Sequence, residues 1–199
     1  MIQSGPISDE LLQFWAASKA GDPAQQFLYS YRILEHSAHI LIDSGPRIAV
    51  KRVLKLPHVM DQIEDCVDQI VEAVQSTKSD DYSKMETLMK TSVDPAHLWE
   101  LINNYNNHFS TSTEFAGGFS VEAIIDGQQS KGDFCVSGLN TVCGSLRKIR
   151  NALSHGRDQK NGSVITPTSE NFRKLKPWAE LVQRIAGEVM INGSSDLRS

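Results

Sequence analysis

The sequence has few cysteines and no long apolar run, and each shortage excludes a class of protein. The three cysteines, Cys66, Cys135 and Cys143, are an odd set without CxxC spacing, which favours a reducing cytoplasm over a disulfide-stabilised secreted fold. The apolar runs are far shorter than the ~20 residues that a membrane-spanning helix needs. Residues 1–10 show neither the basic nor the apolar part of a secretory signal. We therefore expect a cytoplasmic protein with no membrane segment.

What remains is the composition of a globular protein. The chain of 199 residues is 40% hydrophobic and 22% charged, which is ordinary for a soluble domain. A chain of this length can bury a sizeable core within one domain. We find no internal repeat and no low-complexity tract.

Charge is distributed unevenly along the chain. Residues 61–100 carry ten acids and three lysines, a net charge of −7, whereas residues 147–184 carry nine basic residues and three acids, a net charge of +6. We interpret the acidic run as the solvated faces of helices. The basic run has two equally good interpretations, a solvated face or a surface for a phosphate backbone, which releases counterions when basic side chains bind it.

Helix-start signals and apolar periodicity predict an all-α fold. Ser8 is a candidate N-cap, and Asp22-Pro23 and Asp94-Pro95 each place a capping carboxylate before a proline at the first helical position. Apolar side chains then recur at steps of three and four residues, as on one face of a helix. We expect Gly45-Pro46 to end the helix that begins at Pro23, and Pro177 to open the last helix.

Residues 106–136 break this periodicity, and they are rich in Asn, Ser, Thr and Gly. We expect a long loop or a small β-hairpin with strands at 119–125 and 133–136 and a turn between 126 and 132. Loops of this length in compact domains tend to be functional or mobile.

The patterns together predict one helical domain in three parts. Residues 1–21 form an N-terminal helical extension, and residues 22–191 form an up-and-down helical bundle that contains the 106–136 insertion. Residues 192–199 form a disordered tail.

One arginine lies where an apolar side chain is expected. Residues 137–153 form a predicted helix, and Arg150 lies four residues after Leu146 and three before Leu153, inside the apolar stripe. A buried charge without a partner costs several kcal/mol. Arg150 therefore either forms a structural ion pair or lies in a cleft or oligomer interface that receives an anion.

His155 follows at the predicted end of the same helix. In an unbroken helix it would lie about 140° away from Arg150. Gly156 is a good helix terminator and Ser154 is unfavourable within a helix. If the helix ends near Leu153, His155 turns back toward Arg150, and the Asn151 amide can orient the imidazole or a phosphate oxygen.

Arg150-Asn151, three further residues and His155 resemble the motif of HEPN domains, which are small all-helical modules. The likeness covers residues 22–191 in character, since the motif ends a late helix and one more helix follows. The resemblance implies a HEPN-like bundle, a metal-independent endoribonuclease of toxin or antiviral defence systems, and a homodimer that joins two motif-bearing faces. It implies no cofactor.

These three residue types support RNA cleavage by the ribose 2′-hydroxyl. His155 would act as acid or base, Arg150 would bind the phosphate and stabilise the charge of the transition state, and Asn151 would position both groups. One motif histidine per chain is few for an acid and a base, and the dimer that the resemblance implies supplies a second. Nearby basic residues are predicted to bind RNA: Arg147, Arg157, Lys160, Arg173 and Lys174.

Other assignments stay open. HEPN toxins that a nucleotidyltransferase silences carry a tyrosine at the position of Arg157, so we do not expect that regulation, although an antitoxin or sensor protein is a candidate partner. Glu35, His36 and His39 have the spacing of a metal half-site but no further ligand, so we favour a polar cluster without metal. The alternative functions are a catalytically silent HEPN-like module of a larger defence protein, which dimerises or binds RNA or a partner, and a helical bundle with a chance motif.

Overall fold

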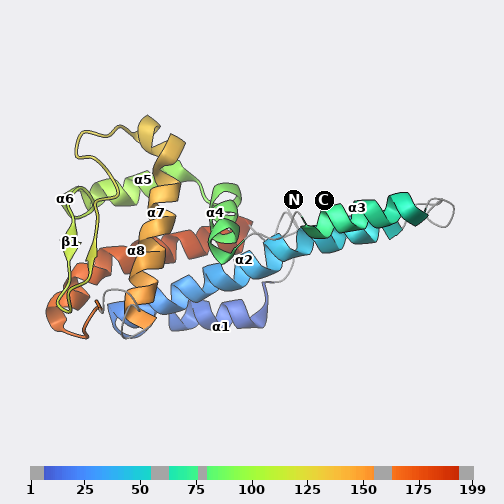
Figure 1. The fold of residues 1–199 in the computed structure, drawn as a ribbon. Coiled ribbons are helices and arrows are strands. Elements are labelled where there is room, and N and C mark those ends of the chain that lie inside the picture. The colour runs from blue at the N-terminus through green and yellow to red at the C-terminus, as the bar shows by residue number, and fades with distance from the viewer. Residues whose placement is uncertain (1–6, 55–62, 76–79, 155–162, 193–199) are drawn as a thin grey trace.

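The computed structural model describes residues 7–54, 63–75, 80–154 and 163–192. Within these ranges the chain forms eight helices and one two-stranded antiparallel sheet, which confirms the predicted all-α class (Figure 1). Most of the predicted tail at 192–199 lies outside the described residues. The elements in chain order are α1 (Asp9–Ala17), α2 (Pro23–Leu54), α3 (Ile63–Gln75), α4 (Asp81–Ser92), α5 (Pro95–Asn104), α6 (Asn106–Phe109), β1 (Thr113–Glu114), β2 (Ser120–Val121), α7 (Lys131–Ser154) and α8 (Ser169–Asn192).

The predicted helix starts are confirmed by hydrogen bonds that the capping side chains accept from backbone N–H groups. Ser8 Oγ accepts from the backbone N–H of Leu11 at 3.3 Å. Asp22 Oδ1 accepts from two backbone N–H groups of the first turn of α2, each at 2.9 Å, and Asp94 Oδ1 accepts from Ala96 N at 2.8 Å. These bonds satisfy N–H groups that have no partner within the helix.

Two predictions based on proline are wrong. The helix α2 continues through Gly45-Pro46 to Leu54, and Pro177 lies inside α8, which begins at Ser169. A proline within a helix removes one backbone hydrogen bond, a local loss that tertiary packing of the helix offsets. Pro177 is buried in the core where α8 packs against α2, and α3 packs along the distal part of α2 (Figure 1).

The predicted hairpin is right in one strand and wrong in the other: β2 lies within 119–125, but its partner β1 precedes it in the chain. The two strands pair Thr113 with Val121 and Glu114 with Ser120. The turn between them contains Gly117 and Gly118 at φ values of 113° and 82°, a left-handed region that favours glycine.

Residues 133–136, expected to form the second strand, instead lie in the first turns of α7, which begins at Lys131. Ser130 caps this helix: its Oγ accepts from Asp133 N at 3.2 Å and donates to Asp133 Oδ2 at 2.6 Å. A serine followed three residues later by an acid is a helix-start signal. The sequence therefore contains a local signal that predicts the start of α7.

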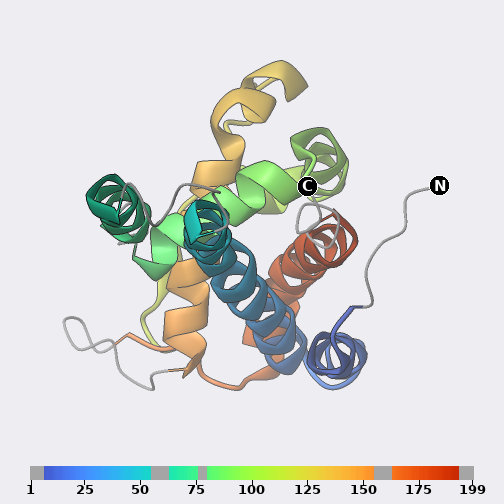
Figure 2. The same cartoon turned by 90° about the vertical axis from the view of Figure 1, so that its right-hand side faces the viewer.

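The helix α2 lies at the centre of the molecule and contacts α1, α3, α4, α7 and α8 (Figure 2). Its most extensive packing is against α8. The distal half of α2 and the helix α3 extend beyond this body as a two-helix arm (Figure 1). No helix among the described residues is both long and apolar enough to cross a bilayer. The largest fully buried side chains of the core include Trp178, Phe27, Phe109 and Phe134.

Candidate functional site

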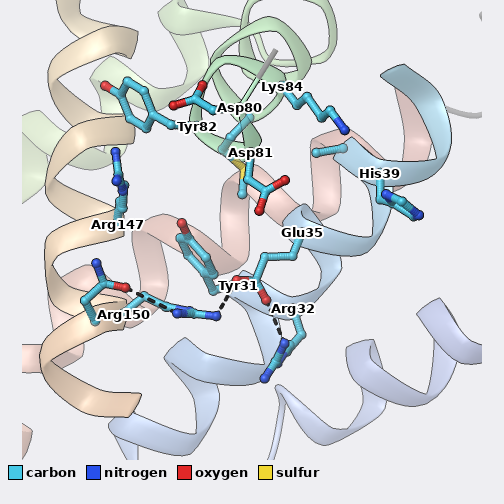
Figure 3. Close-up of a pocket in the computed structure, with 13 residues that line it drawn as sticks. Tyr31, Arg32, Glu35, His39, Asp80, Asp81, Tyr82, Lys84, Arg147 and Arg150 are labelled. Atoms are coloured by element: carbon cyan, nitrogen blue, oxygen red, sulfur yellow. Dashed lines mark hydrogen bonds and ion pairs between the residues drawn. The ribbon is translucent and has the colours of Figure 1, made fainter. Parts of the chain in front are cut away.

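A polar cleft lies between α2, α7 and the start of α4, with a volume of about 610 Å³ (Figure 3). Two of the three motif residues, Arg150 and Asn151, line it. So does Arg147, one of the predicted RNA-binding residues. The other lining residues are Tyr31, Arg32, Glu35, Ala38 and His39 of α2, and Asp80, Asp81, Tyr82, Lys84 and Met85 around the start of α4.

Helical spacing brings these side chains to facing walls. Tyr31, Glu35 and His39 follow each other at intervals of four residues along α2, so they lie on one face of the helix. Arg147 and Arg150 are three residues apart on α7 and share a face for the same reason. The neighbouring positions Leu146 and Ile149 are fully buried, and their packing fixes the rotation of α7 that directs the two arginines to the cleft.

Arg150 forms an ion pair between α7 and α2 in the wall of the cleft. Its Nη2 lies 2.8 Å from Glu35 Oε1, and its Nη1 donates to Asn151 Oδ1 at 3.2 Å. The Arg150 side chain is 22% exposed. The sequence offered two explanations for an arginine in the apolar stripe, an ion pair and a place in a cleft. The structure contains both at the same position.

Glu35 also binds a second arginine. Its Oε2 lies 2.9 Å from Arg32 Nη1, while its Oε1 contacts Arg150. One carboxylate therefore connects two guanidinium groups, and Figure 3 shows it between them. Arg32 is 58% exposed, so this side of the pair is open to solvent.

Arg147 has a different environment. Its guanidinium carbon lies 5.0 Å from the centre of the Tyr82 ring, a cation–π contact. Among the described residues, no carboxylate forms an ion pair with Arg147. Burial, together with a hydrogen bond to Glu86, raises the pKa of Tyr82 to about 12, so the ring that Arg147 contacts is neutral at physiological pH.

The acidic wall of the cleft is partly engaged in capping α4. Asp80 accepts hydrogen bonds from Ser83 N at 2.9 Å and Ser83 Oγ at 2.6 Å, and the bonds from Ser83 lower the pKa of Asp80. On the opposite wall, burial and the nearby carboxylate of Glu35 raise the pKa of Tyr31. The cleft thus combines neutral phenols with charges of both signs.

Glu35, His36 and His39, which have the spacing of a metal half-site, contact different partners. Glu35 binds the two arginines, whereas His36 Nε2 lies 3.5 Å from Glu10 Oε2 of α1. His39 lines the cleft. Across the described ranges, no three His, Cys, Asp or Glu side chains are grouped so that they could bind a metal ion.

The remaining predicted residues divide into two groups. Lys174 and Arg173 lie on α8, and neither lines the cleft. Lys174 Nζ binds Glu170 Oε1 at 2.7 Å and donates to the backbone oxygen of Glu114 at 2.9 Å, so it connects α8 to the strand β1. The other group, His155, Arg157 and Lys160, lies outside the described residues. That His155 turns back toward Arg150 therefore stays a prediction.

Sequence reasoning missed the walls that α2 and α4 contribute. No sequence pattern marked Tyr31, Asp80 or Tyr82 as residues of a site. Arg32 and Glu35 did carry a signal, since oppositely charged residues three apart on a helix pair with each other. The contact of Glu35 with Arg150 depends on tertiary packing, and no local pattern indicates it.

Comparisons of the chain with models of known protein families, with curated proteins and with solved structures find no match. The residues themselves and their geometry therefore carry the functional argument.

Proposed function

We propose that this chain is a metal-independent endoribonuclease of the HEPN type, acting as a homodimer in a toxin or antiphage defence system. One observation carries the proposal: the motif arginine, Arg150, lies in the wall of an open polar cleft and not in a sealed ion pair. Asn151, the second motif residue, contacts the same guanidinium. The third, His155, directly follows the last described residue of α7.

The proposed reaction is transesterification at one RNA phosphate. The ribose 2′-oxygen attacks phosphorus and the bond to the 5′-oxygen of the next nucleotide breaks, which leaves a 2′,3′-cyclic phosphate. One His155 takes the proton of the 2′-hydroxyl, and the His155 of the second copy gives a proton to the leaving 5′-oxygen. Arg150 binds the non-bridging oxygens and stabilises the charge that builds on them.

Arg147 supports RNA as the substrate. It is exposed in the same wall as Arg150, three residues earlier on α7, and stacks on the Tyr82 ring. In this role it binds the phosphate next to the one that is cleaved. Contacts of this kind make binding fall steeply with salt, because each neutralised phosphate releases counterions.

A second function is favoured by the Glu35–Arg150 pair. A guanidinium held at 2.8 Å by a carboxylate of its own chain is also what a catalytically silent module would contain. Such a module would dimerise, or bind RNA or a partner protein as part of a larger defence protein, without cutting RNA.

One experiment separates the two functions. End-labelled RNA is incubated with the purified protein in EDTA, and products are analysed for 2′,3′-cyclic phosphate ends. The nuclease predicts cleavage that is lost in His155→Ala and in Arg150→Gln. His97→Ala is the matched control, because His97 lies on α5 outside the cleft. RNA that is retarded but intact supports a silent module that binds RNA, and an absence of both cleavage and binding refutes the nuclease and the RNA-binding module alike.

A further inference from the structure

The two oxygens of the Glu35 carboxylate each contact a different arginine. Oε1 lies 2.8 Å from Arg150 Nη2, and Oε2 lies 2.9 Å from Arg32 Nη1. A phosphate group presents two non-bridging oxygens to a pair of guanidinium groups in the same manner, and planar guanidinium donors suit carboxylate and phosphate alike. Figure 3 shows the carboxylate between Arg32 and Arg150 at the edge of the cleft.

We propose that Arg32 and Arg150 form a phosphate-binding clamp, in which the carboxylate of Glu35 occupies the place of the phosphate until a ligand displaces it. The identity of the ligand as an RNA phosphodiester rests on the proposed function. The clamp adds two residues to the site: Arg32 as a phosphate ligand, and Glu35 as an internal competitor that weakens binding of any anion.

Partial exposure makes this carboxylate displaceable. The side chains of Arg32, Glu35 and Arg150 are 58%, 29% and 22% exposed, and ion pairs open to water contribute little net stability. Glu35 projects from α2 beside a cleft of about 610 Å³, so a change of its rotamer moves the carboxylate aside. Arg32 shares its helix with Glu35, and Arg150 remains in contact with Asn151.

The groups around the clamp favour an anion once Glu35 has moved. Arg147 lies in the same wall and contacts the Tyr82 ring, with no carboxylate paired to it among the described residues. On the opposite side, Asp80 is engaged by Ser83. Displacement of the Glu35 carboxylate therefore removes its contacts with two guanidinium groups. Arg147 adds a third positive charge in the same cleft, against the remaining negative charge of Asp80 and Asp81.

The test measures binding of a fluorescent RNA oligonucleotide whose 2′-oxygens are methylated, so that it cannot be cleaved by 2′-attack. We expect Glu35→Gln to lower the dissociation constant about fivefold, because it removes a competitor worth about one partly exposed ion pair. Arg32→Gln and Arg150→Gln should weaken binding. Glu100→Gln is the control for the loss of one negative charge, since Glu100 is exposed on α5 outside the cleft, and it should change binding less than about twofold.

Thermal unfolding shows whether each variant folds, and Glu35→Asp provides a second variant. Its shorter carboxylate cannot contact both arginines at once, so it should tighten binding by a smaller factor than Glu35→Gln. In the cleavage reaction, Glu35→Gln should lower KM. A purely structural Glu35 would lower the melting temperature without lowering KM, and that result overturns the clamp.

The outcomes separate the clamp from the nuclease. Tighter binding by Glu35→Gln in a protein that cuts no RNA supports the clamp and refutes the nuclease. Cleavage that depends on His155, together with unchanged or weaker binding by Glu35→Gln, overturns the clamp and keeps the nuclease. The clamp is also overturned if no variant binds the oligonucleotide, or if Arg32→Gln binds as wild type does.

Discussion

Two glycines of α7, the helix that carries Arg147 and Arg150, have opposite surroundings. Gly138 is buried, and a methyl group added to it would overlap the ring of Phe134, one turn earlier. That ring cannot move freely, because it is fully buried and packs against Trp99 with ring centres 5.5 Å apart. A methyl group at Gly144 would meet only the Tyr82 hydroxyl, at an ordinary contact distance of 3.5 Å.

Replacement of each glycine by alanine should therefore change stability in opposite directions. Alanine within a helix is favoured over glycine by about 0.5–1 kcal/mol. At Gly144 nothing opposes this gain, so Gly144→Ala should raise the free energy of unfolding by about that amount. At Gly138 overpacking costs about 1–3 kcal/mol, so Gly138→Ala should lower the free energy of unfolding by about 1 kcal/mol.

Urea denaturation followed by far-UV circular dichroism measures both changes. In a protein of this size, 1 kcal/mol corresponds to about 2–4 °C in melting temperature, so thermal unfolding provides a second measurement. Equal stabilisation by the two substitutions would refute the reasoning, because it would mean that the Phe134 ring has room to move. A lower free energy of unfolding for Gly144→Ala would show that the Tyr82 hydroxyl lies closer to the added methyl group than 3.5 Å.

Three further predictions concern buried polar and titratable groups. The buried side chain of Asn171 forms hydrogen bonds of 2.9 Å with backbone groups of the hairpin turn and of the segment before α8. Asn171→Ala should therefore lower the free energy of unfolding, measured by urea denaturation, by about 2–3 kcal/mol. The exposed control Asn103→Ala should change it little. Burial raises the pKa of the Cys143 thiol to about 12, so iodoacetamide should modify Cys135 before Cys143 in the folded protein, as peptide mass spectrometry can measure. The pKa of Tyr82 is raised from 10.0 to about 12 in the folded protein, so Tyr82 ionises at lower pH in the unfolded state. The contribution of the neutral Tyr82 side chain to stability should be complete below pH 10 and lost toward pH 12. Tyr82→Phe should reduce that loss in alkaline unfolding titrations.

Local signals predicted the helix starts because the groups involved are neighbours in the chain. An aspartate before a proline, as at Asp22 and Asp94, caps N–H groups two or three residues away, and no other part of the protein takes part. The serine and acid at Ser130 and Asp133 are a signal of the same kind, and they predict the start of α7 better than the β-branched and aromatic residues of the segment predict a strand.

The prolines were misjudged because their effect depends on distant packing. Pro46 and Pro177 each remove one backbone hydrogen bond, and sequence alone gives no measure of what offsets it. In α8 the lost hydrogen bond is offset by the burial of Pro177 and its neighbour Trp178 in the core, where α8 packs against α2. Tertiary contacts outweigh a local preference of this size wherever a helix is packed along its length.

The site shows the same division between local and tertiary information. The position of Arg150 in the apolar stripe indicated that it needs either a partner or a cleft, and that inference used only the helical repeat. Its partner, Glu35, lies on α2, far from Arg150 in the sequence, and the start of α4 forms the third wall of the cleft. The cleft forms only because α2, α4 and α7 pack against one another, and local sequence patterns do not indicate that packing.

The degree of burial decides how the Glu35–Arg150 pair should be understood. Removal of one partner of a fully buried pair costs about 3–5 kcal/mol, because the other charge stays uncompensated. At exposures of 29% for Glu35 and 22% for Arg150, water solvates part of each charge, and a cost of about 1 kcal/mol is the better expectation. A pair of that strength orients a guanidinium without locking it. Orientation without locking is what an anion site requires before its ligand arrives, so the ion pair and the cleft describe one function of Arg150 and not two competing ones.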